Sequence, residues 1–166
     1  MVALGIEDLK SFTAGLFIGS LFDHFLVREA SIITYNKFTI DGRIRGGYFS
    51  GEEREEQQIG AFSSWKMLKP FCFSLIKGKR LPESFRIVFL LPEDAKQEFV
   101  NQHGAGLSPE QVGALCVNII YENSFILCTT GISVNIFTTD RTLEHEWDAR
   151  IREFLRNHEI AFLERG

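Results

Sequence analysis

The stretch "ALCVNIIYENSFILCTTGISVNIFTTD", residues 114–140, carries the strongest fold signal in the chain. β-Branched and aromatic side chains dominate it, as is typical of strands. Asn123-Ser124 and Gly131 interrupt the apolar runs, so we predict three strands with turns at these two positions. From Ile132 to Ile136 apolar and polar residues alternate, which predicts an antiparallel sheet with one buried and one solvated face.

A long helix is predicted immediately after this stretch, from about Thr142 to His158. Its apolar residues recur at helical spacing and form a single stripe, which is typical of a helix with one buried face. Two pairs of opposite charge, Glu146 with Arg150 and Asp148 with Arg152, stand four residues apart and favour the solvated side of the same helix. The stripe consists of Leu143, Trp147, Ile151, Phe154, Leu155 and His158.

The N-terminal part of the chain predicts a helix followed by strands. Residues 6–17 follow helical spacing, and Glu7 and Asp8 stand in the first turn, where the helix dipole favours acids. Apolar and β-branched runs between residues 24 and 44 then predict strands. Turn sites within this region are Asn36-Lys37 and Asp41-Gly42.

The segment "GGYFSGEEREEQQIG", residues 46–60, separates two regions of predicted strands. Its glycines flank a charge run that no hydrophobic core would accept. We expect an acidic loop that is mobile, or else a short exposed helix. Neither flank looks complete by itself, so we place no domain boundary here.

Residues 61–91 predict two or three further strands, at 62–69, 71–77 and 85–91. Pro70 and Pro82 favour strand ends or sheet edges, because proline cannot donate a hydrogen bond to a central ladder.

Two short helical signals come next. Pro92 at a first helical position and Gly104 just beyond the end predict a helix between them. Ser108 and Gln111 have the spacing of a capping box, which predicts a second helical start.

These elements predict a single α+β domain over residues 1–166. A mostly antiparallel sheet of meanders would pack against the N-terminal helix and the long C-terminal helix. A chain of 166 residues with 45% hydrophobic and 24% charged residues is typical of one globular domain.

The sequence also predicts where the protein is located and whether its cysteines are reduced. The start "MVALGIEDLKSF" lacks the basic residues of a signal peptide, and no apolar run approaches the ~20 residues that span a bilayer. We therefore expect a soluble cytoplasmic protein with no membrane partner. Cys72, Cys116 and Cys128 each lie in an apolar run, which predicts buried, reduced thiols with a structural role.

Motifs for catalysis and cofactor binding do not occur in the sequence. "HEWDA" has Ala149 where a second zinc-binding histidine would stand, so His145 and Asp148 predict no metal site by themselves. The chain contains no G-x-S-x-G and no glycine-rich phosphate loop. We predict no catalytic residue, metal or cofactor, and favour a protein that is not an enzyme. A catalytic triad assembled from distant residues stays open, because geometry rather than sequence defines it.

The segment "SLIKGKRLP", residues 74–82, concentrates cations in a chain of net charge −4. Lysines at strand ends and sheet edges discourage edge pairing, so a solvated turn is the favoured interpretation. The alternatives are a partner-binding face, or a surface for single-stranded nucleic acid with cations for phosphates and rings for bases. Parity in a strand 71–77 would turn its phenylalanines into the core, which weakens the nucleic-acid interpretation. The candidate binding residues are Trp65, Lys66, Lys69, Lys77, Lys79 and Arg80.

Three stretches together resemble an uncharacterised bacterial family that is known only as a domain of unknown function. They are "FDHFLVREASIITYNKFTIDGR" (22–43), "LIKGKRLPESFRIVFLL" (75–91) and "TTGISVNIFTTDRTLEHEWD" (129–148). The resemblance implies a bacterial, cytoplasmic protein and supplies no catalytic residue, substrate or cofactor.

The leading hypothesis is a non-catalytic binding or protein-interaction module with an unknown protein or anionic partner. It depends on a basic segment close to an acidic one in a chain that lacks a catalytic motif. The first alternative is a nucleic-acid-binding protein that uses residues 65–86. The second is a small-molecule carrier with an aromatic-lined cavity between the sheet and helix 142–158. The sequence leaves the oligomeric state open.

Overall fold

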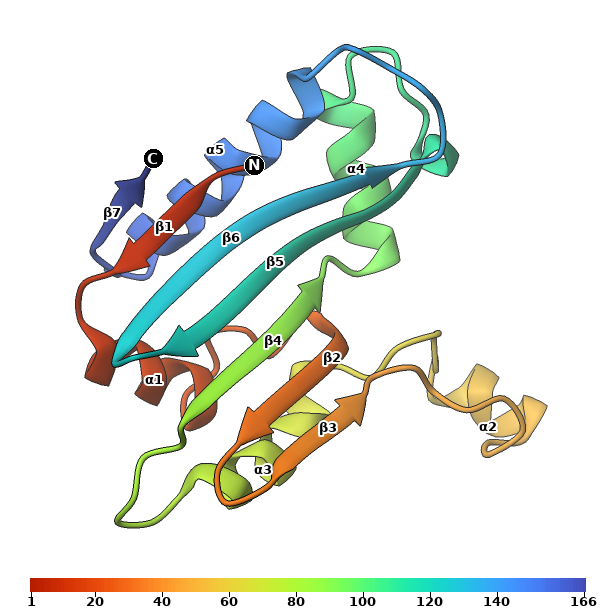
Figure 1. The fold of residues 1–166 in the computed structure, drawn as a ribbon. Helices are drawn as coiled ribbons and strands as arrows, with labels where there is room; N and C mark the ends of the chain where they lie inside the picture. Colours follow the sequence, from red (N-terminus) through yellow and green to blue (C-terminus); the bar gives the residue numbers. More distant parts are fainter.

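A single antiparallel sheet of seven strands organises the molecule (Figure 1). The structure, a computed structural model, describes residues 1–166. The strand order is β3-β2-β4-β5-β6-β1-β7, so the chain ends meet at one edge, where β1 lies between β6 and β7. The strands are β1 Ala3–Ile6, β2 Leu26–Ile33, β3 Lys37–Asp41, β4 Ser84–Leu90, β5 Val112–Glu122, β6 Phe125–Val134 and β7 Phe162–Arg165.

The long hairpin β5–β6 lies near the centre of the sheet. Asn123 and Ser124 form its turn with φ of 53° and 58°, as a two-residue type I′ connection requires, and the predicted turn there is confirmed. The predicted turn at Gly131 is wrong, because β6 continues through it and Gly131 pairs with Cys116. A Cβ at Gly131 would stand 3.3 Å from the Cys116 sulfur, so this glycine serves close packing within the hairpin.

Four helices cover one face of the sheet, which confirms the α+β class (Figure 1). Helix α5 packs on β6, and α3 packs on β2. A fifth, short helix, α2, extends away from the body of the molecule. No helix is long and apolar enough to cross a membrane. The helices are α1 Leu9–Phe17, α2 Gly51–Glu56, α3 Trp65–Ile76, α4 Glu93–His103 and α5 Thr142–Asn157, with a 3₁₀ turn at Pro109–Gln111.

Helix α5 confirms the predicted C-terminal helix. Leu143, Trp147, Ile151 and Leu155 are buried against the sheet, as the stripe predicted. His158 instead lies exposed at the end of the helix, with Nδ1 2.8 Å from the Phe154 carbonyl oxygen.

Residues 65–76 form helix α3, so the predicted strands at 62–69 and 71–77 are wrong. The Ser64 hydroxyl accepts a hydrogen bond from the backbone N–H of Met67 and begins the helix. Trp65 and Cys72 lie on its buried face at helical spacing, and Pro70 lies on its exposed face. The hydrogen bond that Pro70 cannot donate is therefore lost on the side where water is available.

Two further differences from the sequence predictions concern the ends of the chain, and the acidic segment takes one of its two expected forms. The first helix begins only at Leu9, because Asp8 caps it by accepting a hydrogen bond from Ser11, and the residues before it form β1. Strand β7 was not predicted. Of the two alternatives for residues 46–60, the short exposed helix is present as α2, capped by Ser50 and Glu53.

The two short helical signals are confirmed. Helix α4 begins after Pro92, which stands at the capping position just before its first residue, and ends at the capping Gly104. Ser108 and Gln111 form a capping box around the 3₁₀ turn.

Candidate functional site

Trp65, the predicted stacking ring, is inside the core. It is 0% exposed, and its indole N–H donates a hydrogen bond of 2.7 Å to the Leu16 carbonyl oxygen. Its ring packs edge-on against Phe17 and Phe89. The side chain cannot reach a nucleic-acid base, so its inclusion among the surface binding residues needs correction.

Helix α3 also separates Lys66 and Lys69 from the other predicted site residues. The Lys69 ammonium group lies 2.7 Å from an Asp23 carboxylate oxygen and 2.6 Å from the Gly19 carbonyl oxygen, and its side chain is only 14% exposed. Its charge therefore joins α3 to the connection between α1 and β2. Lys66 is exposed, but about three helical turns, roughly 16 Å, separate it from Lys77 at the end of the helix.

Lys77, Lys79 and Arg80 are brought together, in the connection between α3 and β4. We name residues 77–83 the basic loop. The three cations are exposed and take part in no ion pair or side-chain hydrogen bond of the structure. Gly78 has a φ of 134°, which a residue with a Cβ rarely adopts, so a glycine is required where the chain leaves the helix.

Strand pairing places the basic loop beside the turn between β2 and β3. Ile33 pairs with Ser84, and the Glu83 N–H donates a hydrogen bond of 2.8 Å to the Ile33 carbonyl oxygen. Thr34 and Tyr35, the next residues of the turn, therefore lie against the loop. Sequence reasoning missed both, since only the β2–β4 register joins segments so far apart in the chain.

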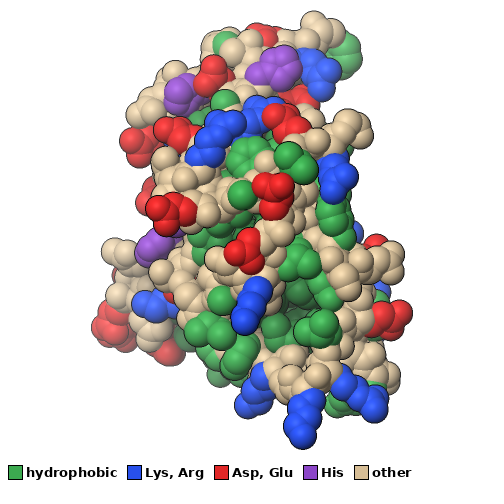
Figure 2. All heavy atoms as spheres, turned by 90° about the vertical axis from the view of Figure 1, so that its left-hand side faces the viewer, with side chains coloured by type: hydrophobic (Ala, Val, Ile, Leu, Met, Phe, Trp, Pro, Cys, Tyr) green, Lys and Arg blue, Asp and Glu red, His purple; other side chains and the backbone are tan.

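The turn and the basic loop enclose a hollow of about 550 Å³. Tyr35 is 86% exposed at its rim, and the Thr34 hydroxyl oxygen is buried without a hydrogen-bond partner. Figure 2 shows Lys and Arg side chains gathered at this lower end of the molecule, below exposed hydrophobic side chains. The lining residues are Thr34, Tyr35, Leu75, Lys77, Gly78, Lys79, Arg80, Leu81 and Glu83.

The backbone of the basic loop offers further donors. The N–H groups from Gly78 to Leu81 donate no hydrogen bond within the structure. Successive free N–H groups next to cationic side chains attract anions. The loop therefore combines point charges with directional donors, and Glu83 is the one acid among the residues that line the hollow.

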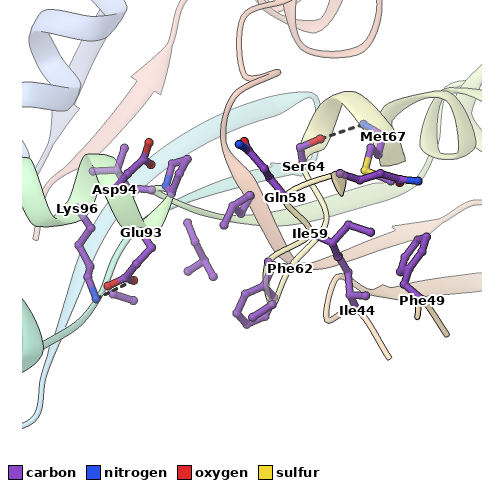
Figure 3. A pocket seen from close by; sticks show the side chains of 18 of the residues that line it. Ile44, Phe49, Gln58, Ile59, Phe62, Ser64, Met67, Glu93, Asp94 and Lys96 are labelled. Carbon is purple, nitrogen blue, oxygen red and sulfur yellow. Dashed lines mark hydrogen bonds and ion pairs between the residues drawn. The ribbon is translucent and has the colours of Figure 1, made fainter. Parts of the chain in front are cut away.

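A second hollow, of about 630 Å³, lies at the other end of β4 (Figure 3). Its lining is largely apolar, with Ile44, Phe49 and Phe62 on one side. On the other side Glu93 and Asp94 stand at the start of α4. We name this hollow the acidic groove. It was not predicted, because its walls come from five separate segments of the chain.

Lys96 is the only cation in the lining of the acidic groove, and its charge is used internally. Its ammonium group lies 2.7 Å from the Val112 carbonyl oxygen and 3.0 Å from a Glu93 carboxylate oxygen, and the residue is buried. Asp94 has no cation partner. Helix α2, with four glutamates and Arg54, lies in the chain between the lining residues Phe49 and Gln57, so its net negative charge stands close to the rim, although none of its own residues lines the groove.

Aromatic side chains pack the layer between the sheet and α5, where the small-molecule-carrier alternative places a cavity. Phe22 stacks on Phe89 with ring centroids 4.7 Å apart, and Phe154 packs against Phe22 and Phe25. The basic-loop hollow and the acidic groove both lie elsewhere.

The structure gathers no group of three or more His, Cys, Asp or Glu side chains that could hold a metal ion. Asp148, the predicted neighbour of His145, is buried and accepts a hydrogen bond from the Thr130 hydroxyl.

The three thiols are unpaired, and two of them are buried. Burial raises the pKa of Cys72 to about 11 and that of Cys128 to about 12. Thiols with such pKa values carry little of the nucleophilic thiolate at neutral pH, which supports a structural role.

The sequence model of a protein family, described as a family of unknown function (DUF5721), matches residues 15–163. No curated protein sequence and no solved structure matches the chain.

Proposed function

We propose that this chain, which belongs to the family of unknown function DUF5721, is a non-catalytic binding module that takes an anionic partner at the basic loop. One observation carries the proposal: Lys77, Lys79 and Arg80 are unpaired and together rim a hollow of about 550 Å³. Cations that serve only as edge protection need no concavity between them, whereas a binding site does.

The chemistry of the loop supports an anion more than an apolar ligand. Its cations attract a negative group from a distance, and the free N–H groups of Gly78 to Leu81 can orient that group on arrival. Helix α2 does not screen this charge, since it forms no ion pair with the loop and extends from another part of the molecule (Figure 1).

The structure gives less support to nucleic acid as the anionic partner of the basic loop. The buried Trp65 removes the main stacking ring, and Lys69 is committed to Asp23. Among the residues that line the hollow, Tyr35 is the one exposed ring. Base stacking supplies much of the affinity for single strands, so one ring supports the nucleic-acid alternative weakly. The bacterial origin and cytoplasmic location remain predictions from the sequence.

Titration with inorganic pyrophosphate, followed by NMR of the backbone amides, tests this function. We expect saturable shifts at Gly78 to Leu81 and at Thr34 and Tyr35, weakening as salt is added. The Lys79→Gln/Arg80→Gln variant should lose them. The matched control Lys10→Gln/Arg28→Gln removes two exposed, unpaired cations elsewhere and should keep them. Shifts that are absent, or equal in both variants, would reject anion binding at the loop.

A further inference from the structure

We propose that the basic loop of one copy docks into the acidic groove of a second copy, so that chains associate head to tail. This inference rests on the proposed function, since it identifies the anionic partner of the basic loop as another molecule of the same chain. It joins two hollows of the molecule whose surroundings carry opposite charge.

The charges of the two surfaces are complementary. Glu93 and Asp94 line the acidic groove, and Lys96 offsets only Glu93. Helix α2 at the rim adds four glutamates against one arginine, and none of these glutamates is in an ion pair. The basic loop presents three free cations and one acid. Contact between them would bring together unlike charges that neither surface satisfies internally, which favours this pairing over like-charged ones.

The apolar features of the two surfaces also correspond. Leu81 projects from the basic loop with 79% of its surface exposed, between Arg80 and Pro82. Apolar side chains, among them Ile59 and Phe62, dominate the lining of the acidic groove. A leucine that directly follows two cations matches an apolar floor with acids close to its rim, and its burial there gives the charged contact an anchor.

The two surfaces cannot meet within one molecule. The basic loop precedes Ser84, the first residue of β4, and the acidic groove includes Leu90 and Leu91 at its far end. Seven residues of strand place them roughly 20 Å apart. An interface between two different surfaces is heterologous, so each docked copy leaves one loop and one groove free. Association continues in this way until a ring closes or a filament grows.

Sedimentation velocity of the full chain over a range of concentrations tests the proposal. At about 50 mM salt we expect the weight-average sedimentation coefficient to rise with concentration, and at about 500 mM salt to stay at the monomer value. The variants Lys79→Glu/Arg80→Glu and Glu52→Lys/Glu56→Lys should each remain monomeric. An equal mixture of the two should associate again, because each retains the surface that the other lacks.

Matched controls keep the charge changes but move them away from both surfaces. Lys10→Glu/Arg28→Glu and Glu7→Lys/Glu153→Lys alter exposed residues elsewhere and should associate like the wild type. Leu81→Asn tests the apolar anchor without a change of charge. Because burial of an exposed leucine side chain strengthens association by about tenfold or more, we expect this variant to associate at least about tenfold more weakly.

The outcomes separate this inference from the proposed function. A wild-type chain that stays monomeric at low salt, yet shows pyrophosphate shifts at the basic loop, overturns head-to-tail association and leaves anion binding standing. Association that survives both charge reversals overturns the inference as well. The Glu52→Lys/Glu56→Lys variant should still bind pyrophosphate, whereas absence of those shifts in every variant would reject the proposed function itself.

Discussion

At the scale of single residues, burial decides which candidate side chains can serve a surface. Trp65 and the cations after it form one cationic and aromatic cluster in the sequence, but the structure separates Trp65, Lys66 and Lys69 from the three cations of the basic loop. The indole lies in the core and Lys69 closes an internal ion pair, whereas Lys79 and Arg80 have no partner within the chain. A cation that has no partner and lies next to a concave surface is therefore a stronger sign of binding than cations and aromatic residues that are close only in the sequence.

Replacement of Trp65 tests this distinction. Trp65→Phe removes the hydrogen bond to Leu16 and leaves that carbonyl oxygen buried without a donor, so we expect a loss of about 1–3 kcal/mol in the free energy of unfolding. Urea denaturation measures it. Tyr35→Phe, at an exposed ring, should change the stability by less than about 0.5 kcal/mol. A Trp65→Phe protein of unchanged stability but altered pyrophosphate affinity would contradict the buried position of Trp65 and indicate that its side chain takes part in binding at the surface.

At the scale of elements, the helices and turns that could be predicted from the sequence are those with a long periodic pattern of apolar residues or a characteristic local turn sequence. Helix α5 has sixteen residues with one apolar stripe, and the turn at Asn123-Ser124 has its own conformational signature. Strands β1 and β7 have four residues each, too few for a period to show, and their pairing joins opposite ends of the chain. The hollow at the basic loop was missed for the same reason, since Thr34 and Tyr35 reach it only through the β2–β4 register.

Helix α3 shows how one residue can mislead the assignment of an element. Trp65, Leu68, Cys72 and Leu75 follow helical spacing after a capping Ser64, which is sufficient for a helix. Because proline is rare in a helix interior, the presence of Pro70 favours a strand end or a sheet edge over a helix when only the sequence is considered. The structure accommodates it on the exposed face.

The position of Pro70 predicts that α3 is less stable than it could be. Pro70→Ala restores a backbone donor and removes the steric clash of the ring, while the exposed site imposes no packing change. We therefore expect the free energy of unfolding to rise by about 1–3 kcal/mol, measured by urea denaturation. Ser74→Ala, at another exposed position of the same helix, should raise it by much less. A destabilised Pro70→Ala variant would show that Pro70 makes a contact the helix needs.

At the scale of the whole molecule, the two ends of strand β4 differ in the charge of their surroundings. The basic loop precedes this strand and lies at one end of it, and the acidic groove lies at the other end. A chain of net charge −4 therefore has a positively charged surface at one end of β4 and a negatively charged surface at the other. The central strands between these ends supply much of the buried core, whereas α2 buries no residue. Stability is therefore concentrated in the middle of the sheet, whereas the basic loop and α2 lie outside it.

Hydrogen exchange followed by mass spectrometry can test this distribution. In dilute protein, we expect the amides of β4, β5 and β6 to exchange most slowly, because they open only with global unfolding. The amides of α2 should exchange fastest among the helices, since its six residues contact no core. Head-to-tail association would add protection to α2 and the basic loop that grows with concentration and is absent from Glu52→Lys/Glu56→Lys. Strong protection of α2 in dilute protein would instead place this helix against the body of its own chain, and its glutamates would then be poorly placed to receive a second copy.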